Sequence, residues 1–213
     1  MPDPKELRTD YRKGGLDESS ASSDPIAQFA RWFDDAVAAN LPDPNAMTLA
    51  TSAQDGMPAA RVLLLKGFDS RGFVFFTNYT SRKARELEAN PRAAMVFFWA
   101  KLERQARIEG TVQKVSRHES EEYFQSRPRE AQIGAWASHQ SGQIASRALL
   151  DQRQKELEAR FAGGPVPLPD FWGGYRLAPT CLEFWQGRPG RLHDRLCYSR
   201  IADGGWVIRR LEP

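Results

Sequence analysis

The segment Arg191-Leu-His193-Asp-Arg195 carries the densest group of side chains that can take part in chemistry. In an extended chain, alternation places Arg191, His193 and Arg195 on one side. Two arginines and a histidine on one side repel one another unless an anion lies among them. Nothing in the expected fold requires these three residues together, so the segment is our first candidate for an anion-binding site.

A second cationic group begins an expected helix. The stretch from Thr77 to Ser81 places hydroxyl side chains ahead of Arg82 and Lys83, which fall in the first helical turn. Cations at this end of a helix oppose its dipole. A bound phosphate would remove the conflict, because free backbone N–H groups and both cations would converge on it. An ordinary capped surface helix is the alternative.

Two further pairs of residues could bind a ligand. Tyr123 and Arg127 lie near the end of an expected helix, where a phenol and a guanidinium can hold a phosphate together. Arg61 and Lys66 bracket a four-residue apolar run. A regular strand would point them to opposite faces, so they share a ligand only at strand ends or beside a bulge. Charged side chains in solvent are the alternative for each pair.

Polar and aromatic side chains gather at two other places. Gln140 and Ser141 follow Trp136 and can hydrogen-bond a ring system or a phosphate, although a plain loop is the alternative. The aromatic–glycine segments 171–175 and 184–187 would suit a flat cofactor. Core packing explains most residues of this kind, so neither segment identifies a site by itself.

Short strands with turn residues between them must position these groups. Residues 1–23 are polar and lack periodicity, so we expect a flexible arm before a single domain over 24–213. Asp24-Pro25 begins a helix. The run 61–68 is apolar on both faces and is expected to be a central strand. The other expected strands are 47–53, 73–77, 94–100, 105–115, 175–177, 181–185, 196–201 and 206–211, and the other helices are 81–90, 116–125, 128–137 and 146–161.

This order predicts an α+β, mainly β fold, an antiparallel barrel with helical cover, because strands do not alternate with helices as in a parallel sheet. The 213 residues are 41% hydrophobic, enough for a core, and no run is long enough to cross a membrane. We see no secretory signal. A net charge of +3 is spread without a basic stripe, so a nucleic-acid partner is not favoured.

Two cysteines and three histidines form no metal-ligand cluster in the sequence, so no metal site is expected. Cys181 and Cys197 lie in apolar-rich contexts without CxxC spacing and are expected to be reduced core thiols. Reduced thiols favour a cytoplasmic location.

Taken together, these segments resemble the FMN-dependent pyridoxine/pyridoxamine 5′-phosphate oxidase family. Each segment is weak alone, but the ordered set is specific. The matching segments are Arg61–Lys66, Phe76–Asn78, Ser81–Lys83, Leu102–Gln105, Tyr123–Pro128, Gln132–Trp136, Gln140-Ser141, Pro167–Pro169, Phe171–Gly174, Glu183–Gly187, Arg191–Arg195 and Arg210–Pro213.

The resemblance implies a split β-barrel with surrounding helices, working as a homodimer with two FMN molecules at the interface, each touched by both chains. It implies that FMN is held by Arg61, Val62, Leu63, Leu64, Leu65, Lys66, Phe76, Thr77, Arg82, Lys83, Gln105, Gln140, Ser141, Trp185 and Arg195. The substrate would be bound by Arg8, Tyr11, Lys66, Tyr123, Arg127, Arg191 and His193, with Arg191 and His193 as the catalytic pair.

The implied reaction oxidises pyridoxamine or pyridoxine 5′-phosphate to pyridoxal 5′-phosphate, with O2 as electron acceptor and H2O2 as product. Two departures from the family stand out. Ala131 replaces a serine that is frequent in the substrate-phosphate set, and the arm reads Asp17-Glu18 where some relatives are basic. A related split-barrel flavin or deazaflavin reductase, and a non-enzymatic carrier of FMN or pyridoxal phosphate, are the alternatives.

Overall fold

The computed structural model describes residues 3–7 and 10–213. In this part of the chain, nine strands form one antiparallel sheet in the order β2-β1-β5-β6-β7-β4-β3, with β8 added beside β7 and β9 beside β8. The strands are β1 Ala46–Ser52, β2 Pro58–Leu64, β3 Gly67–Asp69, β4 Gly72–Asn78, β5 Arg92–Trp99, β6 Arg104–Lys114, β7 Trp172–Gln186, β8 Asp194–Arg200 and β9 Trp206–Arg210.

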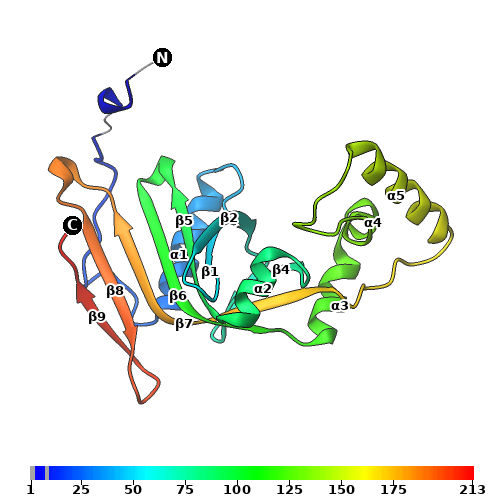
Figure 1. Cartoon of the computed structure of the whole chain (residues 1–213). Helices are drawn as coiled ribbons and strands as arrows, with labels where there is room; N and C mark the ends of the chain where they lie inside the picture. The colour runs from blue at the N-terminus through cyan, green and yellow to red at the C-terminus, as the bar shows by residue number, and fades with distance from the viewer. Residues whose placement is uncertain (1–2, 8–9) are drawn as a thin grey trace.

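Helices close the ends of this sheet. They are α1 Pro25–Ala38, α2 Arg82–Ala89, α3 Arg117–Ser126, α4 Arg129–Ala137 and α5 Arg147–Arg160, with short 3-10 turns η1 Pro4–Glu6, η2 Ala100–Leu102 and η3 Pro189–Arg191. Figure 1 shows α3, α4 and α5 gathered at one end of β7 and the β8–β9 hairpin at the other. The fold is the expected split β-barrel, and no helix among the described residues is long and apolar enough to cross a membrane.

The inner face of the curled sheet encloses the main core. Alternate residues of the strands, such as Leu49, Phe97 and Phe184, are fully buried there. Helix α1 closes this core. It begins at Pro25, because Asp24 accepts a hydrogen bond from the Ile26 N–H and proline suits the first helical position. Its Phe29 is fully buried and packs edge-on against Phe68, Phe73 and Phe97.

Strand β2 corrects one expectation. We expected a central strand, but in this chain β2 lies at the edge of the sheet and pairs only with β1 among the described strands. Val62 and Leu64 point away from the inner face and are 67% and 40% exposed. The expected strand 61–68 also divides, since β2 ends at Leu64 and β3 begins at Gly67. An apolar face needs cover, and the described chain leaves this face open.

Strand β7 corrects a second expectation. We expected separate strands at 175–177 and 181–185, but β7 is continuous over 15 residues. Glu109 pairs with Cys181 and Gly110 pairs with Pro179, so Thr180 is an extra residue that forms a β-bulge. Proline lacks an N–H donor, which suits a point where the ladder is interrupted. The break that we expected between residues 177 and 181 is therefore a bulge and not a loop.

The two cysteines correct a third expectation. They are free and lie on the outer face of β7 and β8, where each is only partly buried, and they are not core residues. The sulfur atoms of Cys181 and Cys197 are 3.3 Å apart. Burial and the Cys197 neighbour raise the pKa of Cys181 to about 12. The thiol is therefore protonated at neutral pH.

Replacing Phe29 by alanine tests the packing of α1 on the barrel. The substitution leaves a cavity among three other aromatic rings, and we expect the free energy of unfolding to fall by about 3–5 kcal/mol. Urea denaturation of both proteins measures this difference. Val37→Ala on the same helix is the control, since Val37 is 50% exposed and should change stability little. Equal, small losses for the two variants would contradict this account of the core.

Candidate active site

A cavity of about 410 Å³ lies where β2 and β4 meet α3 and α4. It is lined by seven of the predicted site residues, Leu64, Lys66, Phe76, Thr77, Tyr123, Arg127 and Gln140, together with Pro128, Ala131 and Trp172. We call it the Arg127 pocket. Its size is within the range of small-molecule sites.

Parallel aromatic rings form one wall of the Arg127 pocket. The rings of Phe76 and Tyr123 stack with centroids 4.0 Å apart, and Trp172 stacks on Phe76 at 5.6 Å. The Lys66 ammonium lies 5.9 Å from the centre of the Tyr123 ring, and the Arg127 guanidinium lies 4.8 Å from that of Trp172. Both cations are thus placed over ring faces, which attract positive charge.

Arg127 is incompletely satisfied. Among the residues that the structure describes, its Nη1 is the one buried side-chain nitrogen or oxygen without a hydrogen-bond partner. Burial lowers the pKa of Arg127 below its ordinary value, although the group stays charged at neutral pH. A buried, charged donor without an acceptor is costly, and an anion in the pocket would supply the acceptor.

A second cationic group adjoins this pocket. Lys83, only 6% exposed, donates hydrogen bonds from Nζ to Gln140 Oε1 at 2.7 Å and to Thr77 Oγ1 at 3.1 Å. Thr77 and Gln140 also line the Arg127 pocket, so the two groups share a wall. Ser141, held at φ +69°, accepts a hydrogen bond from the Arg82 N–H at the start of α2. We call Arg61, Arg82, Lys83, Thr77, Gln140 and Ser141 the phosphate cluster.

A buried carboxylate organises the phosphate cluster. Glu86, 5% exposed, accepts hydrogen bonds from Arg61 Nη2 at 3.1 Å, from Arg82 Nε at 2.7 Å and from the Thr51 hydroxyl. Burial alone would raise the pKa of Glu86, but these hydrogen bonds bring it below the usual value. Three cations and one carboxylate leave two positive charges, which balance the roughly two negative charges of a phosphate monoester at neutral pH.

The other predicted cofactor residues lie elsewhere, on the outer face of the sheet. Phe98 pairs with Gln105, Gln105 pairs with Trp185, and Trp185 pairs with Arg195, so four side chains form one row across four strands. Arg195 donates two hydrogen bonds to the buried Glu183, at 2.9 and 3.0 Å. Glu183 also pairs with Arg107, which in turn pairs with Glu109, so two carboxylates balance the two arginines. This pairing corrects our expectation that Arg195 needs an outside anion.

Arg191 and His193 line a third region together with Tyr11. His193 Nδ1 accepts a hydrogen bond from the Arg188 N–H at 3.1 Å, so in the neutral ring the proton is on Nε2. Arg191 lies in the left-handed region at φ +63°, a conformation costly for this residue type that persists at functional sites. Because Arg191 belongs to a turn, the expected alternation of an extended segment holds only from Asp194 onward.

The structure thus sorts the predicted residues into two places. The Arg127 pocket and the phosphate cluster adjoin at the first. The row of Gln105, Trp185 and Arg195 meets the region of Arg191 and His193 at the second, where the Trp185 and His193 rings lie 4.7 Å apart, and this place shares no lining residue with the Arg127 pocket. Val62 is exposed on β2, Leu63 packs against the core and Leu65 is buried. Arg8 lies outside the described residues.

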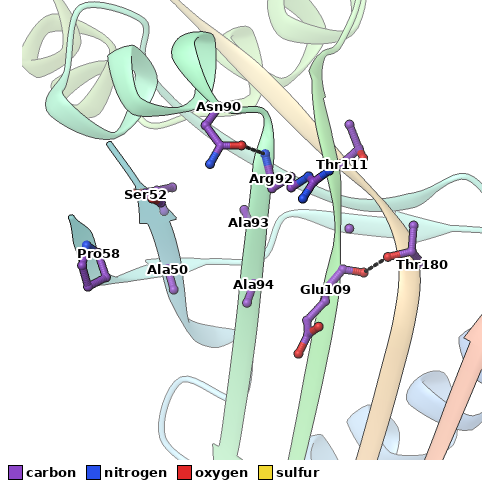
Figure 2. A pocket seen from close by; sticks show the side chains of 12 residues that line it. Ala50, Ser52, Pro58, Asn90, Arg92, Ala93, Ala94, Glu109, Thr111 and Thr180 are labelled. Atoms are coloured by element: carbon purple, nitrogen blue, oxygen red, sulfur yellow. Dashed lines mark hydrogen bonds between the residues drawn. The ribbon is translucent and has the colours of Figure 1, made fainter. Parts of the chain in front are cut away.

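A larger groove of about 600 Å³ contains none of the predicted residues. Figure 2 shows it across β1, β5 and β6, with Pro58 of β2 at one side and Thr180 of β7 at the other. Within the sheet, the Thr180 hydroxyl donates to the Glu109 carbonyl, and the hydroxyl of Thr51, another lining residue, donates to Glu86 on α2. It brings together no group of cations comparable with the two sites above.

Sequence reasoning missed the carboxylates. Glu86 holds two predicted phosphate ligands, and Glu183 holds Arg195. The spacing of Arg82 and Glu86, four residues apart on one helix, is a signal that would have found the first. The alternation of Glu183 with Trp185 on one strand would have found the second.

Removing the charge of Arg127 tests whether it is unpaired. In phosphate-free buffer, we expect Arg127→Met to leave the free energy of unfolding unchanged or raise it by about 1 kcal/mol, because an unsatisfied buried donor is lost. Arg129→Met is the control and should destabilise, since Arg129 donates hydrogen bonds to the carbonyls of Phe161 and Gly164. Denaturant titration measures both. A loss above about 1 kcal/mol in Arg127→Met would mean that the guanidinium is already paired.

Known proteins resemble this chain over nearly its whole length. A pyridoxine/pyridoxamine 5′-phosphate oxidase of Cupriavidus pinatubonensis is 58% identical over 208 residues, which cover 98% of each chain. One of Rubrobacter xylanophilus is 58% identical over 97% of this chain and 95% of its own.

Solved structures agree with this resemblance. PhzG of Burkholderia lata 383, determined in complex with tetrahydrophenazine-1-carboxylic acid, superposes with a TM-score of 0.87 at 34% identity and covers 92% of this chain and 95% of its own. A pyridoxamine 5′-phosphate oxidase-related, FMN binding protein of Nostoc punctiforme, at 18% identity and a TM-score of 0.70, covers 87% and 97% and shows the fold alone.

Two family models also match. Residues 33–161 match the model described as pyridoxamine 5′-phosphate oxidase. Residues 172–213 match the model described as the pyridoxine 5′-phosphate oxidase C-terminal dimerisation region. The chain therefore belongs to the pyridoxine/pyridoxamine 5′-phosphate oxidase family.

Proposed function

We propose that this chain, as a homodimer, binds FMN and oxidises pyridoxamine or pyridoxine 5′-phosphate to pyridoxal 5′-phosphate, with O2 as acceptor and H2O2 as product. The observation that carries the proposal is the unpaired, buried Nη1 of Arg127, which lies beside a second cationic group across a shared wall. Two adjoining cation sites suit two phosphate monoesters, one on the cofactor and one on the substrate.

The phosphate cluster fits the FMN phosphate. Lys83, Arg61 and Arg82 supply the positive charge, and Ser141 and the start of α2 supply polar groups. The substrate phosphate is then assigned to Lys66, Tyr123 and Arg127 in the Arg127 pocket. Ala131 lines this pocket with a methyl group, so the chain offers no hydroxyl donor at that position.

A second copy of the chain completes the site. Val62, Leu64 and Phe98, exposed by 67%, 40% and 56%, lie on the outer face of the sheet, and Phe98 continues into the row of Gln105, Trp185 and Arg195. An exposed apolar face of this kind marks a protein interface. Pairing two such faces would cover the apolar residues and bring one chain's row to the other chain's phosphate cluster.

In this arrangement FMN would supply the two-electron acceptor, which O2 would reoxidise. The chain's own residues bind and orient the substrate. Lys66, Tyr123 and Arg127 of one chain hold the phosphate end. From the second copy, the His193 Nε2–H donates a hydrogen bond to the ring 3-oxygen, and the Arg191 guanidinium stabilises charge that develops on the ring. This reaction requires no protein nucleophile.

An aerobic assay with pyridoxamine and pyridoxine 5′-phosphate tests the function directly. The FMN-loaded protein should form pyridoxal 5′-phosphate and H2O2 from one or both. Arg191→Asn should lose about 100-fold in turnover, the scale for removing a charge-stabilising donor, while FMN stays bound. Asparagine tolerates the left-handed backbone at residue 191, so the loss reports on the guanidinium.

Three results would contradict parts of the proposal. If the protein is colourless and does not bind FMN, the cofactor assignment is wrong. Bound FMN without turnover on either substrate leaves a carrier or a reductase of another compound. Full activity in Arg191→Asn removes Arg191 from the mechanism.

The pH dependence of FMN binding tests Lys83. Burial, together with Arg61, lowers the pKa of Lys83 to about 8. The ammonium is therefore present below that pH and lost above it, so FMN affinity should fall as the pH rises from about 7.5 to 9.5. Fluorescence titration of the apoprotein measures it. Lys83→Met should bind FMN more weakly and without this fall, and riboflavin, which lacks the phosphate, is the control ligand. An unchanged FMN affinity across this range would contradict the assignment.

A further inference from the structure

One of the contacts that attach the N-terminal arm to the barrel is made by a buried carboxylate. Glu103, 7% exposed, follows η2 in the turn between β5 and β6. Its Oε2 accepts hydrogen bonds from the backbone N–H groups of Arg12 and Lys13, at 2.8 and 2.9 Å. In the described part of the chain, no cation forms an ion pair with Glu103. The hydrogen-bond donors that stabilise this carboxylate therefore include two backbone amides of the arm.

Hydrogen bonds to a carboxylate are about twice as strong as those between neutral groups. Two consecutive amides on one oxygen form a specific contact, because they fix both the position and the direction of the arm. If the arm left, Glu103 would regain water and the two amides would lose their acceptor. The contact thus favours the docked arm without requiring any particular side chain at residues 12 and 13.

The same residue also positions the end of β7. The Glu103 carbonyl accepts a hydrogen bond from the Gly187 N–H at 2.7 Å. A Cβ atom at Gly187 would lie 2.7 Å from Cβ and Cγ of Tyr11, which is too close, so only glycine leaves room for that ring. Glu103 therefore holds together the arm and the surface on which Tyr11 packs.

Tyr11 lies beside two residues of the proposed active site. Its ring is perpendicular to that of Trp185, with centroids 5.6 Å apart, and lies 5.8 Å from the His193 ring. Trp185 and His193 are themselves 4.7 Å apart. Further along the arm, the Leu16 N–H donates to Asp194 Oδ2 at 3.0 Å. The segment with Tyr11 is thus fixed on its C-terminal side by contacts that include Glu103 and Asp194, of which Glu103 is the nearer.

We propose that Glu103 is a positioning residue, which holds the arm by its backbone so that Tyr11 lies against Trp185 and His193 before substrate arrives. The anchoring follows from the contacts above, and its effect on the reaction rests on the proposed function. Glu103 itself touches neither the substrate nor the cofactor in this assignment.

Glu103→Asn tests the anchor. Asparagine tolerates the φ of +56° at this position, but its side chain is one methylene shorter and cannot reach both amides. Glu103→Gln keeps the reach and an oxygen acceptor but not the charge, so its effects should be intermediate. Glu121→Asn on the exposed face of α3 is the matched control, because it removes the same charge away from the arm.

Hydrogen exchange of the FMN-loaded protein gives the first readout. In Glu103→Asn, the amides of residues 12 and 13 should exchange about tenfold faster, and trypsin should cleave after these residues about tenfold faster. The control should match the parent protein. Unchanged exchange and cleavage in Glu103→Asn would overturn the anchor, whatever reaction the protein catalyses. If Glu103→Asn fails to fold, faster exchange in Glu103→Gln supports the anchor and unchanged exchange overturns it.

Steady-state kinetics give the second readout. KM for pyridoxamine 5′-phosphate should rise about tenfold in Glu103→Asn, while FMN affinity changes less than about twofold. A loss of FMN would point to a general structural defect and overturn the positioning role. Faster exchange with an unchanged KM would also overturn it. Absence of turnover in the parent protein would reject the proposed function and leave the exchange result standing.

Discussion

Several positive charges must leave water when this chain folds, and the structure treats them unequally. Arg61 and Arg82 share Glu86, and Arg195 is held by Glu183. Arg127 receives ring faces and no acceptor for its Nη1. A charge left without an acceptor weakens the fold, and the aromatic core around Phe29 offsets that loss. The site is therefore preorganised for an anion, since the cations are fixed before it arrives.

The uncovered outer face of the sheet is a second constraint on the structure. A strand whose residues are apolar on both faces is stable at a sheet edge only if something covers the outward face. The described chain covers the inner face of β2 alone. The row of Phe98, Gln105, Trp185 and Arg195 runs from this apolar patch to polar side chains. Within one chain these polar side chains do not reach the Arg127 pocket. Geometry and family membership thus favour the same assembly.

Local patterns predicted most of the fold. The caps at Asp24, Ser81 and Ser116 marked helix starts, and each accepts the hydrogen bond that defines its cap. The sequence could not predict that β2 lies at the sheet edge, because a strand buried by its own chain and one buried by a second chain have the same apolar pattern. The bulge in β7 was hidden for a related reason, since Pro179 marks an interruption without saying whether the strand resumes.

The candidate site was predictable where charge was in conflict with its surroundings. Arg82 and Lys83 oppose a helix dipole, and Tyr123 and Arg127 lie together at a helix end. The carboxylates were not predictable in the same way. Glu86, Glu103 and Glu183 look like ordinary surface acids in the sequence, and only their burial reveals that they hold other groups. Side chains that act through a neighbour leave little trace in residue type or spacing.

The extra residue at Thr180 decides which side chains of β7 face the same side of the sheet before and after the bulge. Trp172 and Trp185 are separated by an odd number of positions, so a regular strand would turn them to opposite faces. The ladder with β6 shows that outward positions before the bulge, such as Ala178, continue as Cys181 and Trp185 after it. Deleting this single residue would invert one end of the strand relative to the other. Length variation among relatives should thus be confined to the loops and absent from this stretch.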